Sequence, residues 1–124
     1  MGSDKDYLAR ILIVDDDSTF RRTLRLSLRS LGHETTDAGS GDEAMQFAKA
    51  AAPDVAVVDW QMPGMDGLQT CNALHGRFGV PVIMISANQA NSKSSAFAAG
   101  ASDFLNKPFA LEDLLMSITT ILQR

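Results

Sequence analysis

Several short apolar runs in this chain end in a chemically reactive residue. Residues 11–14, 55–58 and 82–85 are apolar at every position, as strands must be when helices cover both faces of a parallel sheet. Such strands end at one shared edge, where ligands of open α/β sheets bind. The pattern therefore predicts an architecture and a site together. The residues after the runs are Asp15 to Asp17, Asp59, Ser86 and, following the Phe-Leu-Asn run at 104–106, Lys107.

Length and composition indicate one globular domain. A chain of 124 residues is long enough to bury one core and too short for a second. Its 45% apolar and 21% charged residues are ordinary for a folded domain. We expect residues 1–8 to be a disordered or tag-like N-terminus ahead of a domain over 9–124. The apolar runs are only strand-length and residues 1–10 lack a signal-peptide core, so we expect a cytoplasmic domain without membrane contact.

Charge and cysteine content narrow the possible partners. The net charge of −4 disfavours direct nucleic acid binding by this domain, because phosphate backbones attract clustered Lys and Arg. The local exception is a group of four arginines within nine residues, from Arg21 to Arg29. The single cysteine, Cys71, excludes an internal disulfide, and its helical surroundings favour a packing role.

Helical spacing and end signals divide the rest of the chain. We expect Ser18 to be the N-cap of the first helix and Gly32 to follow its end. The apolar face of that helix would consist of Phe20, Leu24, Leu28 and Leu31. The predicted helices cover 18–31, 41–51, a segment that carries Leu68 to Phe78, 90–99 and 111–122, and the predicted strands cover 11–14, 34–38 (a polar edge strand), 55–58, 82–85 and 103–106.

Five strands that alternate with five helices predict a doubly wound α/β fold with a parallel sheet. Right-handed crossovers leave few strand orders, and the flavodoxin-like order 2-1-3-4-5 puts the first and third strands side by side. Asp15, Asp16 and Asp59 would then be neighbours.

Three neighbouring carboxylates need a partner. At an effective dielectric near 20, two unit charges 4 Å apart repel by roughly 4 kcal/mol, so such a cluster takes up protons or binds a cation. A set of oxygen ligands suits Mg²⁺ or Mn²⁺, and Mg²⁺ commonly shares its carboxylates with a phosphate oxygen. Lys107 and Ser86 would stabilise the other oxygens of that phosphoryl group, and Asp59 would be the nucleophile.

These residues stand in motifs that resemble the receiver domain of two-component response regulators, of the kind found in chemotaxis regulators. The resemblance covers residues 9–123. It rests on five motifs in order: Ile-Val-Asp-Asp at 13–16, Val-Asp-Trp-Gln-Met-Pro-Gly-Met-Asp-Gly at 58–67, Ile-Ser-Ala at 85–87, Ala-Gly-Ala-Ser-Asp-Phe at 99–104 and Lys-Pro-Phe at 107–109.

The resemblance implies a phosphoacceptor in a phosphorelay rather than a conventional enzyme. Asp59 would take a phosphoryl group from a phosphohistidine on a sensor histidine kinase or a histidine phosphotransfer protein, and the domain would catalyse only its own phosphorylation and dephosphorylation. Asp16, Asp59 and the backbone carbonyl of Gln61 would bind Mg²⁺ directly, with Asp15 acting through water. Lys107 would pair with the phosphoryl oxygens beside a cis Lys107-Pro108 bond.

It also implies a conformational switch that controls a partner or an attached output domain. Ser86 would move toward the phosphoryl group and Phe104 would rotate inward behind it. Serine stands where threonine is more frequent and phenylalanine where tyrosine is common, which leaves the size of the shift open. Gln61 and Asn88 occupy positions that tune the lifetime of the acyl phosphate.

The resemblance also implies that the first helix docks against the phosphodonor. We expect Arg22 and Leu26 to make that contact, because both lie away from the apolar face of the helix. Asp66 would cap the third helix, and Trp60 would lie at the rim as an optical reporter. His33 and His75 flank glycines and are expected to be exposed loop histidines. The last helix lacks the basic residues of a charge-paired dimer face, and the oligomeric state stays open.

Two alternatives give different functions. A haloacid-dehalogenase-like phosphatase also uses aspartate nucleophiles and Mg²⁺, but its two acids lie two residues apart after the first strand and it carries a cap. A receiver that serves only as a docking module would be expected to lack Asp16, Asp59 or Lys107. Both a stand-alone regulator and a receiver within a longer protein are compatible with the sequence.

Overall fold

The computed structural model describes residues 8–123, in which five strands alternate with five helices. The predicted N-terminal extension lies outside the described residues except for Leu8. The strands are β1 (Arg10–Val14), β2 (Glu34–Ala38), β3 (Val55–Asp59), β4 (Val82–Ser86) and β5 (Asp103–Asn106), and the helices are α1 (Ser18–Ser30), α2 (Gly41–Ala50), α3 (Gly67–Phe78), α4 (Lys93–Ala98) and α5 (Leu111–Leu122).

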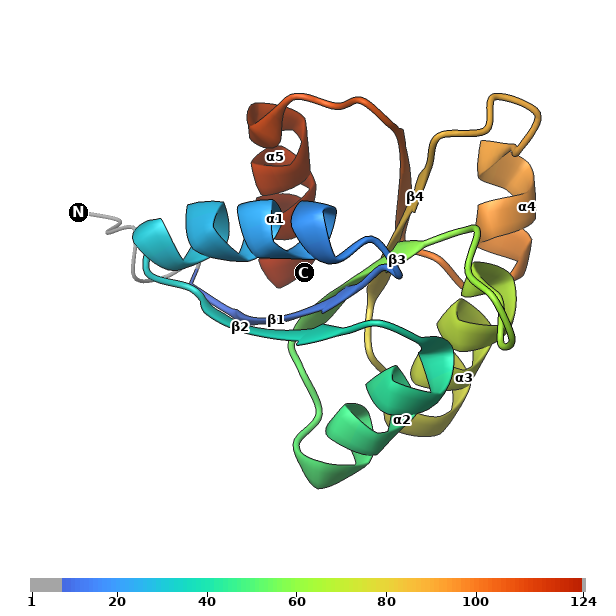
Figure 1. Cartoon of the computed structure of the whole chain (residues 1–124), viewed down its shortest axis with the longest axis horizontal. Helices are drawn as coiled ribbons and strands as arrows, with labels where there is room; N and C mark the ends of the chain where they lie inside the picture. The colour runs from blue at the N-terminus through green and yellow to red at the C-terminus, as the bar shows by residue number, and fades with distance from the viewer. Residues whose placement is uncertain (1–7, 124) are drawn as a thin grey trace.

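All five strands are parallel and lie in the order β2-β1-β3-β4-β5, which confirms the predicted topology (Figure 1). Every residue of β3 and β4 is buried, because helices cover both sides of these strands. The polar strand β2 lies at an edge, as its composition predicts.

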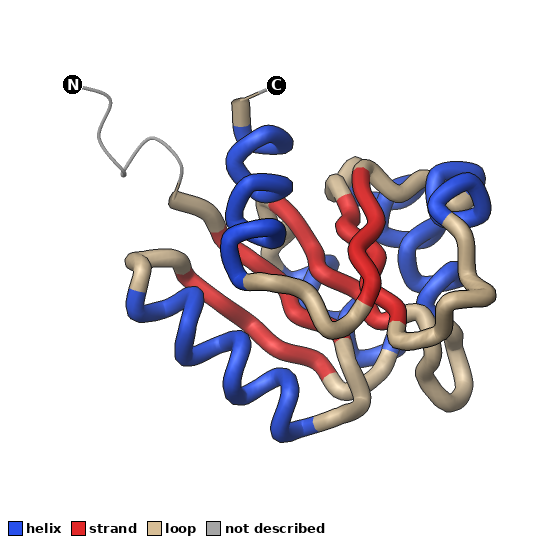
Figure 2. Tube along the Cα trace, turned by 90° about the horizontal axis from the view of Figure 1, so that it is seen from above, coloured by secondary structure: helices blue, strands red, loops and turns tan. Residues whose placement is uncertain are grey.

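Two apolar layers hold the helices on the sheet. Ile11 and Ile13 face α1 and α5, whereas Leu12 and Val14 face α2, α3 and α4, because alternate side chains of a strand point to opposite faces. Figure 1 shows α1 and α5 together on one side of the sheet, and Figure 2 shows the same two helices in front of the strands. Cys71 is fully buried in the layer under α2 to α4, which agrees with its predicted packing role.

The start and end of α1 differ from the prediction. Asp17, not Ser18, is the N-cap, because its Oδ1 accepts hydrogen bonds from the backbone N–H groups of Thr19 (3.0 Å) and Phe20 (3.2 Å). The helix ends one residue early, so Leu31 lies beyond the last turn and is 47% exposed rather than buried. Gly32 follows with φ 97°, as expected for the residue after a helix end.

Helix α4 and the histidines also differ from the prediction. Helix α4 is shorter than the predicted 90–99 and begins after Ser92, whose hydroxyl caps the N–H of Ser95. His75 lies in α3 rather than in a loop, although it is exposed as predicted. His33 is half-buried rather than exposed, because its Nδ1 accepts a 3.1 Å hydrogen bond from the backbone N–H of Ala9. Asp66 caps α3 in a capping box with Gln69, as predicted.

No helix within residues 8–123 is both long and apolar enough to cross a bilayer.

Candidate functional site

An acidic cluster lies where β1 and β3 end. Strand pairing puts Val14 beside Val58, so the residues that follow on the two strands meet. Asp15, Asp16 and Asp59 each offer a carboxylate oxygen, and these three atoms lie within 4.8 Å of one another. Asp15 and Asp59 are buried, at 1% and 8% exposure, whereas Asp16 is exposed. The sheet thus brings together all three predicted acids.

The cluster is unfavourable for the charge on Asp59. Burial, together with the negative charges of Asp15 and Asp16, raises the pKa of Asp59 to about 6, although Lys107 opposes the shift. The raised pKa shows that the nearby Lys107 ammonium does not balance the negative charge of the three acids. The chemistry of the site therefore favours a cation with oxygen ligands.

Lys107 is the cation that the chain itself supplies. Its Nζ donates a 2.7 Å hydrogen bond to Asp15 Oδ2 and lies 3.7 Å from Asp59 Oδ1. The Lys107-Pro108 bond is cis, as the resemblance implies. The ammonium also lies 4.1 Å from the ring centroid of Phe20 on α1, where the aromatic face attracts it. Phe20 was not expected in the site, because its helical spacing is that of a core residue.

Arg21 fixes the loop that carries Asp15 and Asp16. Its Nη1 donates to the backbone oxygen of Asp15 at 2.7 Å, while its Nε donates to Asp37 of β2 at 3.1 Å. Arg25 donates to the same carboxylate at 2.8 Å. Although burial opposes it, these hydrogen bonds lower the pKa of Asp37. Arg29 also donates to Thr35. Three of the four arginines of α1 therefore form hydrogen bonds within the domain.

Ser86 and Phe104 lie on the neighbouring strands. The Ser86 side chain is fully buried and its hydroxyl is hydrogen-bonded within the loop that follows β4. Phe104 is 8% exposed, and its ring makes an edge-to-face contact with Trp60 at a centroid distance of 5.7 Å. The ring for which an inward rotation is predicted is therefore already buried in this structure. Trp60 is half-buried against the same apolar layer.

The remaining predicted residues lie around this centre. Gln61 and Asn88 have exposed side chains in the loops after β3 and β4, and a backbone hydrogen bond from Gln61 acts to lower the pKa of Asp59. Arg22 is exposed on α1, and Leu26, one turn further along, is 56% exposed.

A match to the response regulator receiver domain covers residues 11–119. The chain belongs to this family. Among curated relatives, the receiver domain is 41% identical over 117 residues to Response regulator MprA of Mycobacterium tuberculosis, which covers 93% of this chain and 51% of that protein. It is 36% identical over 118 residues to Heme response regulator HssR of Staphylococcus aureus, covering 94% of this chain and 53% of that protein. This receiver domain therefore spans about half the length of these relatives.

Solved structures give the same result. The receiver domain superposes on the chemotaxis protein CheY4 of Vibrio cholerae with a TM-score of 0.84 and 31% identity, covering 92% of this chain and 98% of that one. For the receiver domain of NtrX from Brucella abortus the TM-score is 0.84 with 32% identity, covering 91% and 98% of the two chains. The chain is thus a signalling module of two-component systems rather than a conventional enzyme.

Proposed function

We propose that Asp59 accepts a phosphoryl group from a phosphohistidine on a sensor histidine kinase or histidine phosphotransfer protein in the cytoplasm. The observation that carries the proposal is the position of the Asp59 carboxylate, which lies at the end of β3 beside Asp15, Asp16 and Lys107. A carboxylate oxygen of Asp59 would form the new P–O bond as the P–N bond to the imidazole breaks. The electron pair of that bond stays on the imidazole nitrogen, which then takes a proton from water.

The acidic cluster fits Mg²⁺, or Mn²⁺ in its place. Three carboxylate oxygens within 4.8 Å of one another form a compact set of hard ligands. Asp16, Asp59 and the backbone carbonyl of Gln61 would bind the ion directly, and Asp15 through water. The bound ion would neutralise charge on the phosphoryl oxygens.

The other side chains in the site would respond to the added charge. The Lys107 ammonium, which now bonds to Asp15 and lies near Asp59, would turn to a phosphoryl oxygen. The Ser86 hydroxyl would donate a hydrogen bond to a second phosphoryl oxygen, and the Phe104 ring would rotate inward behind Ser86. Gln61 and Asn88 are exposed, two residues beyond Asp59 and Ser86 respectively, and they would control how readily water reaches the acyl phosphate. The changed surface would control a partner protein or an output domain of a longer chain.

A small-molecule phosphodonor such as acetyl phosphate tests the assignment without a kinase. We expect Mg²⁺-dependent label that is stable to acid and labile to base on the wild type, and none on Asp59→Asn. Asp42→Asn, at an exposed acid on α2, is the matched control and should label normally. Label on Asp59→Asn at the wild-type level would overturn the proposal.

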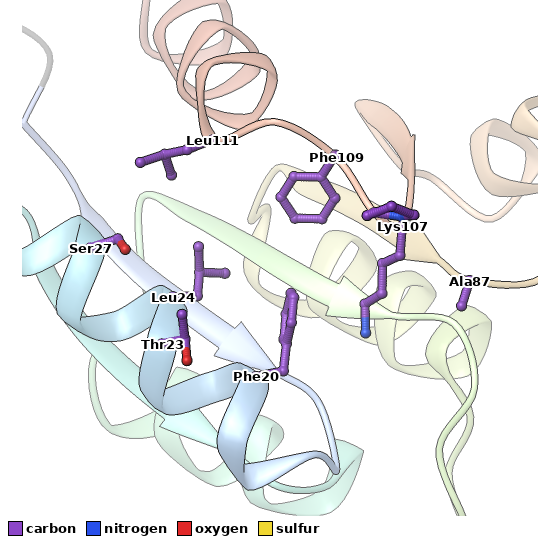
Figure 3. A pocket seen from close by; sticks show the side chains of 9 residues that line it. Phe20, Thr23, Leu24, Ser27, Ala87, Lys107, Phe109 and Leu111 are labelled. Carbon is purple, nitrogen blue, oxygen red and sulfur yellow. The ribbon is translucent and has the colours of Figure 1, made fainter.

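We propose that the phosphodonor docks over α1. Arg22 and Leu26 are both exposed there, and they share a face because they are four residues apart. Beside α1 lies an apolar cavity of about 420 Å³ that reaches Lys107. Figure 3 shows Phe20 and Leu24 on its α1 side, with Phe109 just before α5 and Leu111 at the start of that helix. An apolar side chain of a helical partner would fit this cavity next to the acceptor.

A further inference from the structure

Hydrogen bonds close the loop between β4 and α4 around one hydroxyl group. Ser86 Oγ donates to the backbone oxygen of Asn88 (3.2 Å) and accepts from the backbone N–H of the same residue (3.0 Å). It also accepts from the side-chain amide of Asn91, with Nδ2 at 2.8 Å. The backbone N–H of Asn91 bonds to Asn88 as well, at 3.1 Å. Residues 86–91 thus form one hydrogen-bonded unit.

This arrangement uses the full capacity of the Ser86 hydroxyl. A serine hydroxyl has one proton to donate and two lone pairs that accept, and all three are engaged within the loop. The carbonyl of Ser86 is fixed too, because it accepts a 2.7 Å bond from the backbone N–H of Lys107. Ser86 can therefore donate toward Asp59 only if its side chain leaves the loop bonds.

Asn91 is the side chain that ties the hydroxyl to the loop. The other two bonds of Ser86 Oγ go to the backbone at Asn88 and follow from the turn itself. The Asn91 amide instead reaches back across five residues from a half-buried position just before α4. Because the bond forms only while the Ser86 hydroxyl faces the loop, it favours that arrangement. Its net contribution is modest, since water would otherwise solvate the amide.

We infer that Asn91 is a positioning residue that holds Ser86 away from Asp59 and so sets how easily this receiver domain responds to a phosphoryl group. The inference rests on the proposed role of Asp59. A ligand shifts a two-state equilibrium against the free energy that separates the states. Loss of one hydrogen bond from the resting state therefore tightens the binding of any phosphoryl group that Ser86 contacts.

The test uses beryllofluoride with Mg²⁺ as a phosphoryl mimic, followed by Trp60 fluorescence. Trp60 is the only tryptophan of the chain, directly follows Asp59 and contacts Phe104. For Asn91→Ala we expect the half-saturating concentration to fall about fivefold, equivalent to about 1 kcal/mol. Asn91→Leu, which keeps the volume without the amide, should behave in the same way. Gln89→Ala, at an exposed amide of the same loop, should match the wild type.

A Ser86→Ala background separates positioning from a general loosening of the loop. Without the hydroxyl, Asn91→Ala should change the midpoint by less than about twofold. An equal shift of the midpoint in both backgrounds would overturn the inference, and so would wild-type midpoints for Asn91→Ala and Asn91→Leu. Either result would leave the proposed role of Asp59 intact, provided that the response still depends on Asp59. A wild type without any response that depends on Asp59 would overturn the proposed function, and this inference with it.

Discussion

At the scale of single residues, Asp59 carries its charge where the protein disfavours charge. The pKa is raised to about 6, from an ordinary 3.8, by burial and by the neighbouring acids. Above pH 6 the side chain is mostly ionised and able to act as a nucleophile. The same ionisation lowers the stability of the folded domain when no cation is bound.

Asp59→Asn should therefore stabilise the domain in EDTA at about pH 7.5, by about 1 to 2 kcal/mol. This is less than the pKa shift alone implies, because the amide that replaces the carboxylate is itself a buried polar group. Urea unfolding of both proteins measures the difference in the free energy of unfolding.

The stability difference between the two proteins should depend on pH. Between about pH 4 and 6 the folded state holds the Asp59 proton more tightly than the unfolded chain, so the contribution of Asp59 to wild-type stability falls as pH rises through this window. The advantage of Asp59→Asn should grow over the same range and then stay constant. A variant that is less stable than the wild type at pH 7.5 would show that Lys107 outweighs the two acids.

Some residues of the site can be predicted from the sequence and others cannot. Asp15 and Asp59 directly follow apolar runs, Lys107 follows the Phe-Leu-Asn run of the last strand, and a parallel sheet brings the ends of such strands together whatever the details of packing. Phe20 gives no such signal, since an aromatic residue at helical spacing is typical of a core. Its contact with Lys107 depends on how α1 lies beside the segment that enters α5.

At the scale of the elements, helix ends are less predictable than helix positions. Ser18 and Asp17 are both good N-cap residues, and sequence alone does not say which backbone turn forms. The Asp17 carboxylate binds two N–H groups of the first turn, so the helix begins after it. Leu31 fits the apolar spacing of α1 but falls just beyond the last turn, where the chain turns away at Gly32.

The start of α3 controls the position of Asp59. The backbone N–H of Gly67 donates to the carbonyl of Trp60 at 2.9 Å. A Cβ at Gly67 would overlap the carbonyl oxygen of Asp59 and lie 2.5 Å from the Trp60 Cα. These are backbone atoms at the end of β3, which have no side-chain freedom to move aside. Gly67 is thus required by close packing at the site.

Gly67→Ala should destabilise the domain by about 2 to 3 kcal/mol and slow labelling by acetyl phosphate, because relief of the overlap displaces Asp59. Gly76→Ala is the matched control in the same helix. Its Cβ would meet nothing within 4 Å, so the change should stabilise the domain by about 0.5 to 1 kcal/mol. Thermal unfolding and labelling rates check both. Equal stability of the two variants would contradict the close approach at Gly67.

At the scale of the whole molecule, α1 divides its charged residues between two tasks. Arg21 and Arg25 bind Asp37 on β2 and hold the helix to the sheet. The sequence shows the cluster of arginines but not this division, because Asp37 lies on a strand whose register with α1 is set by the fold. The exposed surface of α1 near the site is therefore smaller and less charged than the sequence suggests. Arg22 and Leu26 remain exposed there and form the docking surface that we propose.

Replacement of Arg22 and Leu26 together by alanine should slow phosphoryl transfer from a phosphorylated histidine phosphotransfer partner by about tenfold or more, as expected when an interface anchor is lost. Both side chains are exposed, so stability should change by less than about 0.5 kcal/mol, and labelling by acetyl phosphate should be unchanged. Leu31→Ala, at an exposed leucine beyond the far end of α1, should transfer at the wild-type rate. Equal slowing with both donors would place the effect in the site rather than in docking, and unchanged transfer would exclude this surface as the contact.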